Sequence, residues 1–308
     1  MSGKPILSPS NNAMHERGLS LRRFKEFVIE SAIYASGVLV IIFVVLIFLF
    51  LAKEGLALFK TVSLSEFFFG KKWYPISEPP QFGIFPLFLG SLLVTLGATI
   101  ISVPVGVASA IYIAEVAPAR TKEILKSGIE LLAAIPSVVL GFIGMVTLVP
   151  LVKTVFKLPT GLTAFSGALV LAFMAMPTIV SIAEDALNAV PRRYKEAALA
   201  LGATRWQAIW RVTLRAASSG IVAAIMLGIG RVIGETMAVM MMTGNAARIP
   251  HSIFNPVRTL TATIAAEMGE TVQGSDHYFA LFAIGIILFI ISFIINLIAD
   301  FALHRKRL

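Results

Sequence analysis

Six long apolar stretches constrain this chain more than any other feature of its 308 residues. An α-helix needs about 20 mostly apolar residues to cross the hydrocarbon core of a bilayer. The stretches that reach or approach this length are Ser31–Ala52, Phe85–Ala114, Gly128–Val152, Leu162–Ala183, Ser218–Thr243 and Tyr278–Ala302. The sequence therefore predicts an all-α polytopic membrane protein with six transmembrane helices. We expect Pro104, Pro136 and Pro177 to kink the second, third and fourth of these helices.

The composition excludes a soluble or a disordered protein. Apolar residues make up 57% of the chain, charged residues only 14%, and the mean hydropathy is +0.87. Soluble domains carry about 25% charged residues, and disordered chains combine low hydrophobicity with high net charge. The absence of cysteine excludes disulfides, thiolate metal sites and cysteine nucleophiles. The four histidines are scattered without ligand spacing, so we expect no metal site and no catalytic residue.

The distribution of basic residues predicts the orientation of the chain. With six spans both termini lie on one side, and the segments on that side carry 17 Lys and Arg residues against 8 on the other. Because basic residues accumulate in cytoplasmic loops, both termini are expected in the cytoplasm, with the chain in the cell (inner) membrane. The net charge of +9 is thus attributed to basic residues in cytoplasmic loops and not to a nucleic-acid-binding surface.

This topology divides the chain into segments. We expect a cytoplasmic N-terminal segment 1–30 in which Met1–Ser20 is loose, a first transmembrane anchor 31–52, a periplasmic loop 53–84, a transmembrane domain 85–302 and a cytoplasmic tail 303–308. The first span is expected to be retained, because 30 residues precede it and Lys53–Glu54 follow it in place of a cleavage site.

The cytoplasmic loop 188–217 predicts two short helices joined by a glycine turn. Pro191 suits the first helical position, and Gly202 can end that helix in the left-handed conformation. Thr204 and Gln207 have the spacing of a capping box for the second helix. Helical spacing predicts one apolar face on each helix, made by Tyr194, Ala197, Ala198 and Leu201 and by Trp206, Ile209, Trp210 and Thr213.

Two interpretations of this hairpin follow from its residues. It can be a basic amphipathic connector that lies on anionic lipid, or a knob that docks into a cytoplasmic partner. The defined turn favours docking, as do the small side chains that permit close approach, namely Ala197, Ala198, Ala200 and Ala203.

The hairpin also resembles the EAA loop of ABC-importer permeases. It contains Glu196-Ala197-Ala198, then Gly202 four residues after Ala198, then Val212-x-Leu214. Family members usually have proline where this chain has Arg215, and its absence predicts a smoother run into the fifth span. The resemblance implies the type I ABC-importer permease (MetI-like) fold. It also implies that the loop contacts an ATPase through Glu196, Ala197, Ala198, Gly202 and Arg205.

Four further motifs are similar to the phosphate-uptake branch of these permeases, and they are Phe82-Gly83-Ile84, the stretch Ile135–Gly141, Met176–Ile179 and Glu184–Leu187. A fifth motif, Gly230–Val239, is similar to the PstC type within that branch. The resemblance implies a PstA-like second permease, two P-loop ATPase subunits that bind ATP and Mg, and an extracytoplasmic phosphate-binding protein as partners, together with the lipid bilayer and no nucleic acid. This chain has no Walker A sequence, so we expect it to hold no cofactor and to be no enzyme.

Two charges fall inside the fifth span. An arginine or aspartate at a helix centre costs about 2.5–3.5 kcal/mol on insertion scales, so Arg231 and Glu235 need compensation. Their spacing of four predicts a shared helix face and an ion pair. The pair is either structural or part of a polar path, in which the guanidinium suits an oxyanion. The PstC resemblance implies the second. Gly230 and Gly234 form a G-x-x-x-G pattern for helix packing.

Other residues carry weaker predictions. Thr243, Asn245 and Arg248 belong either to an outer vestibule or to a solvated loop. The acidic residues of the last outward loop contact a binding protein or are solvated, and they are Glu267, Glu270 and Asp276. Trp73 and Tyr74 can anchor at the headgroups. The methionines of the fifth span are packing residues, and they are Met237, Met240, Met241 and Met242.

Three functions remain open at this point. The first is the permease half of an ATP-driven phosphate importer. The second is a permease of the same architecture for another oxyanion, such as sulfate or molybdate. The third is a membrane sensor of phosphate that transports nothing.

Overall fold

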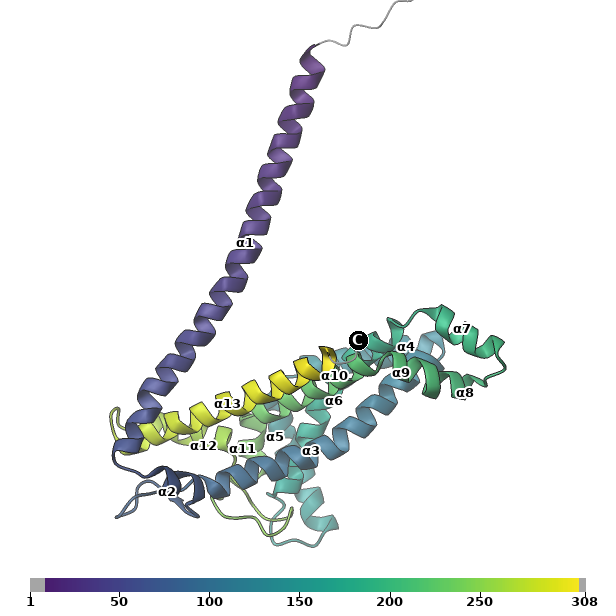
Figure 1. The fold of residues 1–308 in the computed structure, drawn as a ribbon. Helices are drawn as coiled ribbons and strands as arrows, with labels where there is room; N and C mark the ends of the chain where they lie inside the picture. Colours follow the sequence, from purple (N-terminus) through teal and green to yellow (C-terminus); the bar gives the residue numbers. More distant parts are fainter. Residues whose placement is uncertain (1–8, 305–308) are drawn as a thin grey trace, which may run out of the picture. The chain divides into compact units, whose positions relative to one another are not determined.

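The computed structural model describes residues 9–304, and side chains for residues 26–298, 300 and 301 (Figure 1). The chain divides into two units, one ending at Lys53 and the other beginning at Glu54. The long helices are α1 (Pro9–Gly55), α3 (Phe85–Ile111), α4 (Ala119–Ala134), α5 (Ser137–Val155), α6 (Ala164–Asn188), α10 (Ser218–Gly234) and α13 (Asp276–His304). The shorter elements are α2 (Leu64–Phe69), β1 (Trp73–Tyr74), β2 (Gln81–Phe82), α7 (Arg192–Ala200), α8 (Arg205–Ala208), α9 (Leu214–Ala216), α11 (Met237–Met242) and α12 (Leu260–Glu267).

Over its described residues the first unit is a single helix. Within it, the apolar side chains from Phe27 to Leu46 are exposed, as expected for a helix whose solvent is lipid. The predicted anchor is thus an uninterrupted apolar helix. The expectation that Met1–Ser20 is loose is wrong for residues 9–20, because α1 begins at Pro9. Residues 1–8, and residues 305–308 of the predicted tail, lie outside the described part of the chain.

The prediction of six spans is confirmed, with one of them bent. In the described residues, five helices are long and apolar enough to cross a membrane: α1, α3 with its π-helical extension to Val116, α5, α6 and α13. The sixth is the pair formed by the helical segment Arg205–Ala216 and α10, which meet at 69°. The smoother run predicted from the absence of proline at Arg215 is therefore wrong. Ala217 ends the first segment with φ −81° and ψ −2°, and the helix restarts at Ser218 without a proline.

Small residues let the central helices of the second unit pack closely. Helix α6 contacts both α3 and α10, and α10 also contacts α13. A Cβ atom on Gly106 of α3 or on Gly228 of α10 would come within 2.9 and 2.5 Å of Ile179 on α6. Both glycines therefore mark places where helix backbones approach, a common device of membrane bundles. The core between these helices includes Val94, Ala98, Ala168, Leu171, Ala175, Ile179, Val232 and Met242.

Proline acts differently at its three predicted positions. Pro104 and Pro177 lie inside the continuous helices α3 and α6. Pro136 instead separates α4 from α5, with Ile135 extended at φ −70° and ψ 126°. The residue before proline is pushed out of the helical region. The third span, predicted from Gly128, thus begins at Ser137.

Helix α4 is charged and is tied to α6. Lys122 and Lys126 contact Glu184 at 3.0 and 3.1 Å, and the Glu184 side chain is only 2% exposed. The hydrogen bond to Glu184, together with its negative charge, holds the pKa of Lys126 above its usual value. Because two ammonium groups and the Asn188 amide surround the carboxylate, this buried charge is compensated.

The loops of the second unit that are predicted to face outward form a separate core. Strand β1 pairs antiparallel with β2, with Trp73 opposite Phe82. Trp73 is 2% exposed and its ring packs edge-on against Phe82. The predicted headgroup anchor is therefore wrong for Trp73, which is a core residue, while Tyr74 is exposed. This core joins β1 and β2 to α12 and to the start of α13, and it includes Leu58, Phe67, Ile84, Leu87, Leu260, Leu281 and Ile284.

Candidate functional site: a projecting hairpin and a helix break

The hairpin α7–α8 lies at one end of the second unit, and α2 and α12 lie at the other (Figure 1). Helix α7 ends at Ala200, and Gly202 has φ +85°, as the glycine turn requires. Thr204 and Gln207 form both hydrogen bonds of the capping box, at 3.2 and 2.9 Å. Pro191 caps α7 and does not occupy its first position, a shift of one residue from the prediction. The predicted helix–turn–helix is otherwise confirmed.

The hairpin presents apolar side chains to its surroundings. Leu201 is 90% exposed, and Tyr194, Trp206 and Trp210 are about half exposed or more. The two tryptophan rings meet edge to face with centroids 5.8 Å apart. Exposed apolar patches of this kind mark contact sites for proteins or membranes. Of the residues predicted to meet an ATPase, Ala198 is half-buried, and the others are exposed: Glu196, Ala197, Gly202 and Arg205.

The predicted apolar face of the second helix is split. Ile209 and Thr213 are buried, whereas Trp206 and Trp210 point outward. At 3.6 residues per turn, Trp206 and Trp210 lie toward one edge of the predicted face, and Ile209 and Thr213 lie toward the other. The boundary between the exposed and the buried surface therefore runs through the predicted face, and a π-helical turn covers Ile209–Thr213.

An ion pair fastens the hairpin to the end of α3. Lys195 of α7 contacts Glu115, which lies in the π-helical turn Tyr112–Val116 after α3. The Glu115 side chain is 9% exposed, so the pair is shielded from water on one side. No sequence signal indicated this contact, since 80 residues separate its partners.

Arg231 and Glu235 lie at a break in the fifth span. Helix α10 ends at Gly234, and Glu235 is extended with φ −73° and ψ 130°. The Nη1 atom of Arg231 donates to Thr178 Oγ1 at 3.3 Å, and Glu235 Oε1 accepts from the Ala238 backbone N–H at 3.2 Å. Between these two described residues there is no ion pair. The predicted pairing is wrong, because the chain leaves the helix before Glu235 and the i, i+4 geometry is lost.

The guanidinium of Arg231 is open to its surroundings. Its side chain is exposed, and the Thr178 hydroxyl is its one hydrogen-bond partner among the described residues. Thr178 follows Pro177 in α6. The sequence indicates it only as a member of the Met176–Ile179 motif and predicts no contact with Arg231. A guanidinium has five N–H donors, so most of them remain available to an anion. The arrangement is therefore suited to a transient oxyanion contact.

The two glycines of the G-x-x-x-G pattern face open space. A Cβ atom on Gly230 or on Gly234 would meet nothing within 4 Å, in contrast to Gly228 on the same helix. In the described chain an added Cβ atom at either glycine would thus touch no other helix, and Gly230 and Arg231 line a hollow of about 240 Å³ together with Ser292 and Asn296 of α13.

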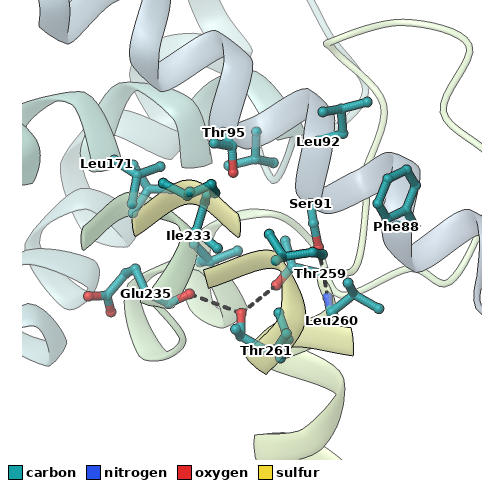
Figure 2. Close-up of a pocket in the computed structure, with 16 residues that line it drawn as sticks. Phe88, Ser91, Leu92, Thr95, Leu171, Ile233, Glu235, Thr259, Leu260 and Thr261 are labelled. Carbon is teal, nitrogen blue, oxygen red and sulfur yellow. Dashed lines mark hydrogen bonds between the residues drawn. The ribbon is translucent and has the colours of Figure 1, made fainter. Parts of the chain in front are cut away.

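A cavity of about 240 Å³ lies beside the helix break (Figure 2). The carbonyl oxygen of Glu235 accepts from Thr261 Oγ1 at 3.0 Å, and the Leu260 N–H donates to Ser91 Oγ at 2.9 Å. Figure 2 shows the Glu235 carboxylate directed away from Thr261, so the cavity receives the backbone of Glu235 and not its charge. Most of the remaining lining is apolar, with Phe88, Leu92, Leu171 and Ile233 among it. This cavity is a packing gap whose hydrogen-bonded hydroxyls belong to Ser91, Thr259 and Thr261, and it is unsuited to an anion.

The outer residues singled out in the sequence separate into different roles. Thr243 is fully buried with its hydroxyl on the Val239 carbonyl, so it is neither vestibule nor solvated loop. Asn245 has φ +47° at a turn, and Arg248 is exposed. Glu267 is not solvated, since it contacts Arg258, His277 and Trp73.

The remaining acidic residues and the methionines lie in ordinary surface and core positions. Glu270 is exposed, and Asp276 accepts a hydrogen bond from Thr61 at 3.0 Å. Met242 is buried in the core and Met241 packs against it, as predicted. The described residues contain no group of three or more His, Cys, Asp or Glu side chains that could hold a metal ion.

Comparison with known proteins identifies the family. A family profile described as "Binding-protein-dependent transport system inner membrane component" matches residues 102–308. The chain is 37% identical over 307 residues to the "Probable ABC transporter permease protein YqgH" of Bacillus subtilis, covering 98% of this chain and 99% of that protein. It is 33% identical to the "Phosphate transport system permease protein PstC" of Mesorhizobium japonicum, covering 94% of each chain.

Solved structures agree on the fold. A chain of a bacterial alginate ABC transporter, in complex with its alginate-bound periplasmic protein, matches with a TM-score of 0.61 at 18% identity, over 92% of this chain and 98% of that one. A chain of the MetNI methionine ABC transporter matches with a TM-score of 0.57 at 19% identity, over 75% and 99%. The expected MetI-like fold is confirmed, and the chain belongs to the inner-membrane permease components of binding-protein-dependent ABC importers, in the branch that contains the PstC permeases.

Proposed function

We propose that this chain is the PstC-type permease subunit of a phosphate importer and forms half of the translocation pathway. The observation that carries the proposal is the open guanidinium of Arg231, which stands at a helix break in a membrane span with one hydroxyl partner in the described chain. Placing an arginine at this depth of a membrane span costs free energy unless a counter-charge compensates it. An oxyanion that passes Arg231 supplies the counter-charge transiently, and the named phosphate permeases at 33–34% identity support phosphate as that anion.

The hairpin supplies the coupling to an ATPase. Its exposed apolar residues and its glycine turn at φ +85° give it a defined shape that needs a receiving groove. We infer that Glu196, Ala197, Ala198, Gly202 and Arg205 contact a cytoplasmic P-loop ATPase, which binds ATP and Mg. Since the hairpin must face the cytoplasm to do so, we expect both termini there as well, which is also what the basic-residue count predicts.

The remaining partners complete the pathway. A PstA-like permease is expected against the open Gly230–Gly234 face of α10, which would put a second wall opposite Arg231. A phosphate-binding protein is expected at the outward loops. Glu235 caps α11 through the Ala238 N–H, so it shapes the path at the break and does not neutralise Arg231.

Reconstitution in lipid vesicles tests this function. The chain is combined with its ATPase, the sister permease and the phosphate-binding protein, and accumulation of radiolabelled phosphate is followed with and without ATP. ATP-dependent accumulation that sulfate and molybdate do not displace is expected. Displacement by sulfate or molybdate indicates a permease for another oxyanion. An assembly that binds ATP and responds to phosphate without accumulating it indicates a sensor.

A further inference from the structure

A second cationic site lies on the outward loops, away from Arg231. A cavity of about 560 Å³ is lined by Lys71, Lys72, Arg248 and His251. The other lining residues are neutral: Tyr74, Ala246, Ala247, Ile249, Asn255 and Pro256. Since the outward loops carry 8 Lys and Arg residues in all, three of the eight converge on this one hollow.

The three basic residues of this cavity lack compensation. None of Lys71, Lys72 and Arg248 has an ion-pair partner within 4.0 Å in the part of the chain described. Like charges that line one hollow repel each other, and the repulsion weakens only when an anion enters or salt screens it. The neighbouring outer basic residue, Arg258, shows the alternative, because it is paired with Glu267. The positive side chains of this cavity are thus not neutralised by ion pairs within the described chain.

Glu267, which lies outside the cavity, holds its two walls in place. Trp73, next to Lys72, donates from Nε1 to Glu267 Oε2 at 3.0 Å. On the other wall, Arg258 contacts the same carboxylate and also donates from Nε to the Asn245 carbonyl at 3.1 Å. Glu267 therefore fixes the β1 strand and the loop that carries Arg248 relative to each other.

The loop wall is also joined to the helix break. The Val257 N–H donates to the Thr243 carbonyl at 2.9 Å, and Thr261 donates to the Glu235 carbonyl at 3.0 Å. Between Glu235 and Arg248 the chain passes only α11, six residues or about 9 Å of helix, and a turn with positive φ at Gly244 and Asn245. The basic hollow and the Arg231 region are thus built on one continuous, hydrogen-bonded segment.

We propose that this hollow is an outer oxyanion site, occupied by free inorganic phosphate before it reaches Arg231. This rests on the proposed function. A concave site with a few convergent polar groups is typical of a small ligand and not of a flat protein contact. Lysine, arginine and histidine are all donors to a tetrahedral oxyanion, and the volume admits such an anion with several waters, since one water takes about 30 Å³ of the liquid.

The absence of cysteine from the chain provides a clean probe. Ala246 lines the hollow, so Ala246→Cys introduces a thiol of minimal size there. The whole transporter in nanodiscs, without the binding protein, is treated with a negatively charged thiosulfonate reagent, and labelling is followed on this chain alone. Inorganic phosphate is compared with chloride at equal ionic strength, so that general screening is the same in both.

Phosphate is expected to slow the modification of Ala246→Cys. The added changes Lys71→Gln, Lys72→Gln and Arg248→Gln should raise the phosphate concentration needed for protection by about tenfold or more, which corresponds to about 1.4 kcal/mol. The matched control also removes three positive charges, by Lys60→Gln, Lys153→Gln and Lys157→Gln. These three lysines are exposed and do not line the hollow, so the control should keep full protection.

Three results would overturn the site. The first is equal labelling in phosphate and chloride, and the second is protection that survives the triple change. The third comes from a parallel sample to which the binding protein is added: protection by the binding protein but not by phosphate would make the basic wall a docking surface. The vesicle assay distinguishes failure of this site from failure of the proposed function. Protection without ATP-driven uptake supports the anion site and contradicts the proposed function. ATP-driven uptake without protection supports the proposed function and contradicts the anion site.

Discussion

The two ends of the second unit are built in opposite ways. The hairpin α7–α8 is ordered by local interactions, a glycine turn and a capping box, and leaves its apolar side chains exposed. The loops at the opposite end, which are predicted to face outward, are ordered by contacts between distant segments, since Trp73, Arg258 and His277 all contact Glu267. The hairpin has a defined shape but its apolar side chains are uncovered, whereas the loops bury their own apolar core. The difference indicates that the hairpin depends on a partner to bury these side chains and that the loops do not.

Gly202→Val should show the largest effect on ATPase docking. A residue with a Cβ atom in the left-handed region costs about 1–2 kcal/mol, and 1.4 kcal/mol is a factor of ten in a population. Both ATPase co-purification and phosphate uptake should fall by about tenfold or more. Gly202→Asn should retain more of both, because asparagine tolerates positive φ.

The outward end offers a matched control for this change. Gly274 has φ +80° and, like Gly202, has nothing within 4 Å of an added Cβ atom. Gly274→Val should therefore carry the same backbone strain but leave ATPase co-purification intact. Equal loss of the ATPase in both variants would show that the hairpin has no special role in docking.

Arg231→Gln should abolish uptake while leaving insertion and ATPase capture unchanged, because the residue lies between the two ends and supports neither. Arg231→Lys should keep part of the uptake, since an ammonium group cannot reproduce the planar fork of a guanidinium. Because Arg231 and Glu235 form no ion pair, adding Glu235→Gln to Arg231→Gln should not restore activity. Uptake near the parental rate in the double variant would refute the pathway role of Arg231.

Glu267→Gln should destabilise the outward end alone. It removes a charge that three side chains contact, and hydrogen bonds to charged groups contribute about 1.5–3 kcal/mol each. A lower melting temperature and faster proteolysis of the 244–258 loop are expected, with ATPase co-purification unchanged. Glu270→Gln is the control, because Glu270 is exposed on the same side. A similar loss of stability in both variants would argue against the Glu267 cluster.

The ion pair between Lys195 and Glu115 should give the smallest effect. Partly exposed pairs contribute about 0.2–1 kcal/mol, so Lys195→Glu should lower the ATPase activity stimulated by substrate by a few-fold at most. The swap of Lys195→Glu with Glu115→Lys should restore it. A swap that behaves like the sum of the two single changes would show that the pair does not couple the hairpin to α3.

The same contrast explains how far the sequence predicts this structure. The turn at Gly202 and the capping box follow from residues at fixed short offsets, and they were predicted correctly. The contact between Trp73 and Glu267 joins residues 194 positions apart, and no local pattern encodes it. Residue type alone therefore assigns Trp73 to the headgroup region, and no sequence pattern groups the three basic residues of the outer hollow, Lys71, Lys72 and Arg248.

The membrane helices show a similar limit. Hydropathy predicted the six spans but not where they break. Pro136 and Pro177 are the same residue type in similar apolar surroundings, yet only Pro136 ends a helix. Whether proline breaks a span depends on neighbours that satisfy the freed backbone groups, and those neighbours come from tertiary packing. The end of α10 at Gly234 has no proline signal, which is why Arg231 and Glu235 were expected to pair.

The break at Gly234–Glu235 has a consequence for what surrounds it. Where a helix stops, its last carbonyl groups lose their partners within the helix, and Thr261 accounts for one nearby carbonyl, that of Glu235. Hydrocarbon tails offer no hydrogen bonds, so non-helical backbone at membrane depth persists only against protein or water. The side of α10 that carries Arg231 consequently contacts water or another subunit. The lipid-facing surface of the protein must therefore be formed by other helices.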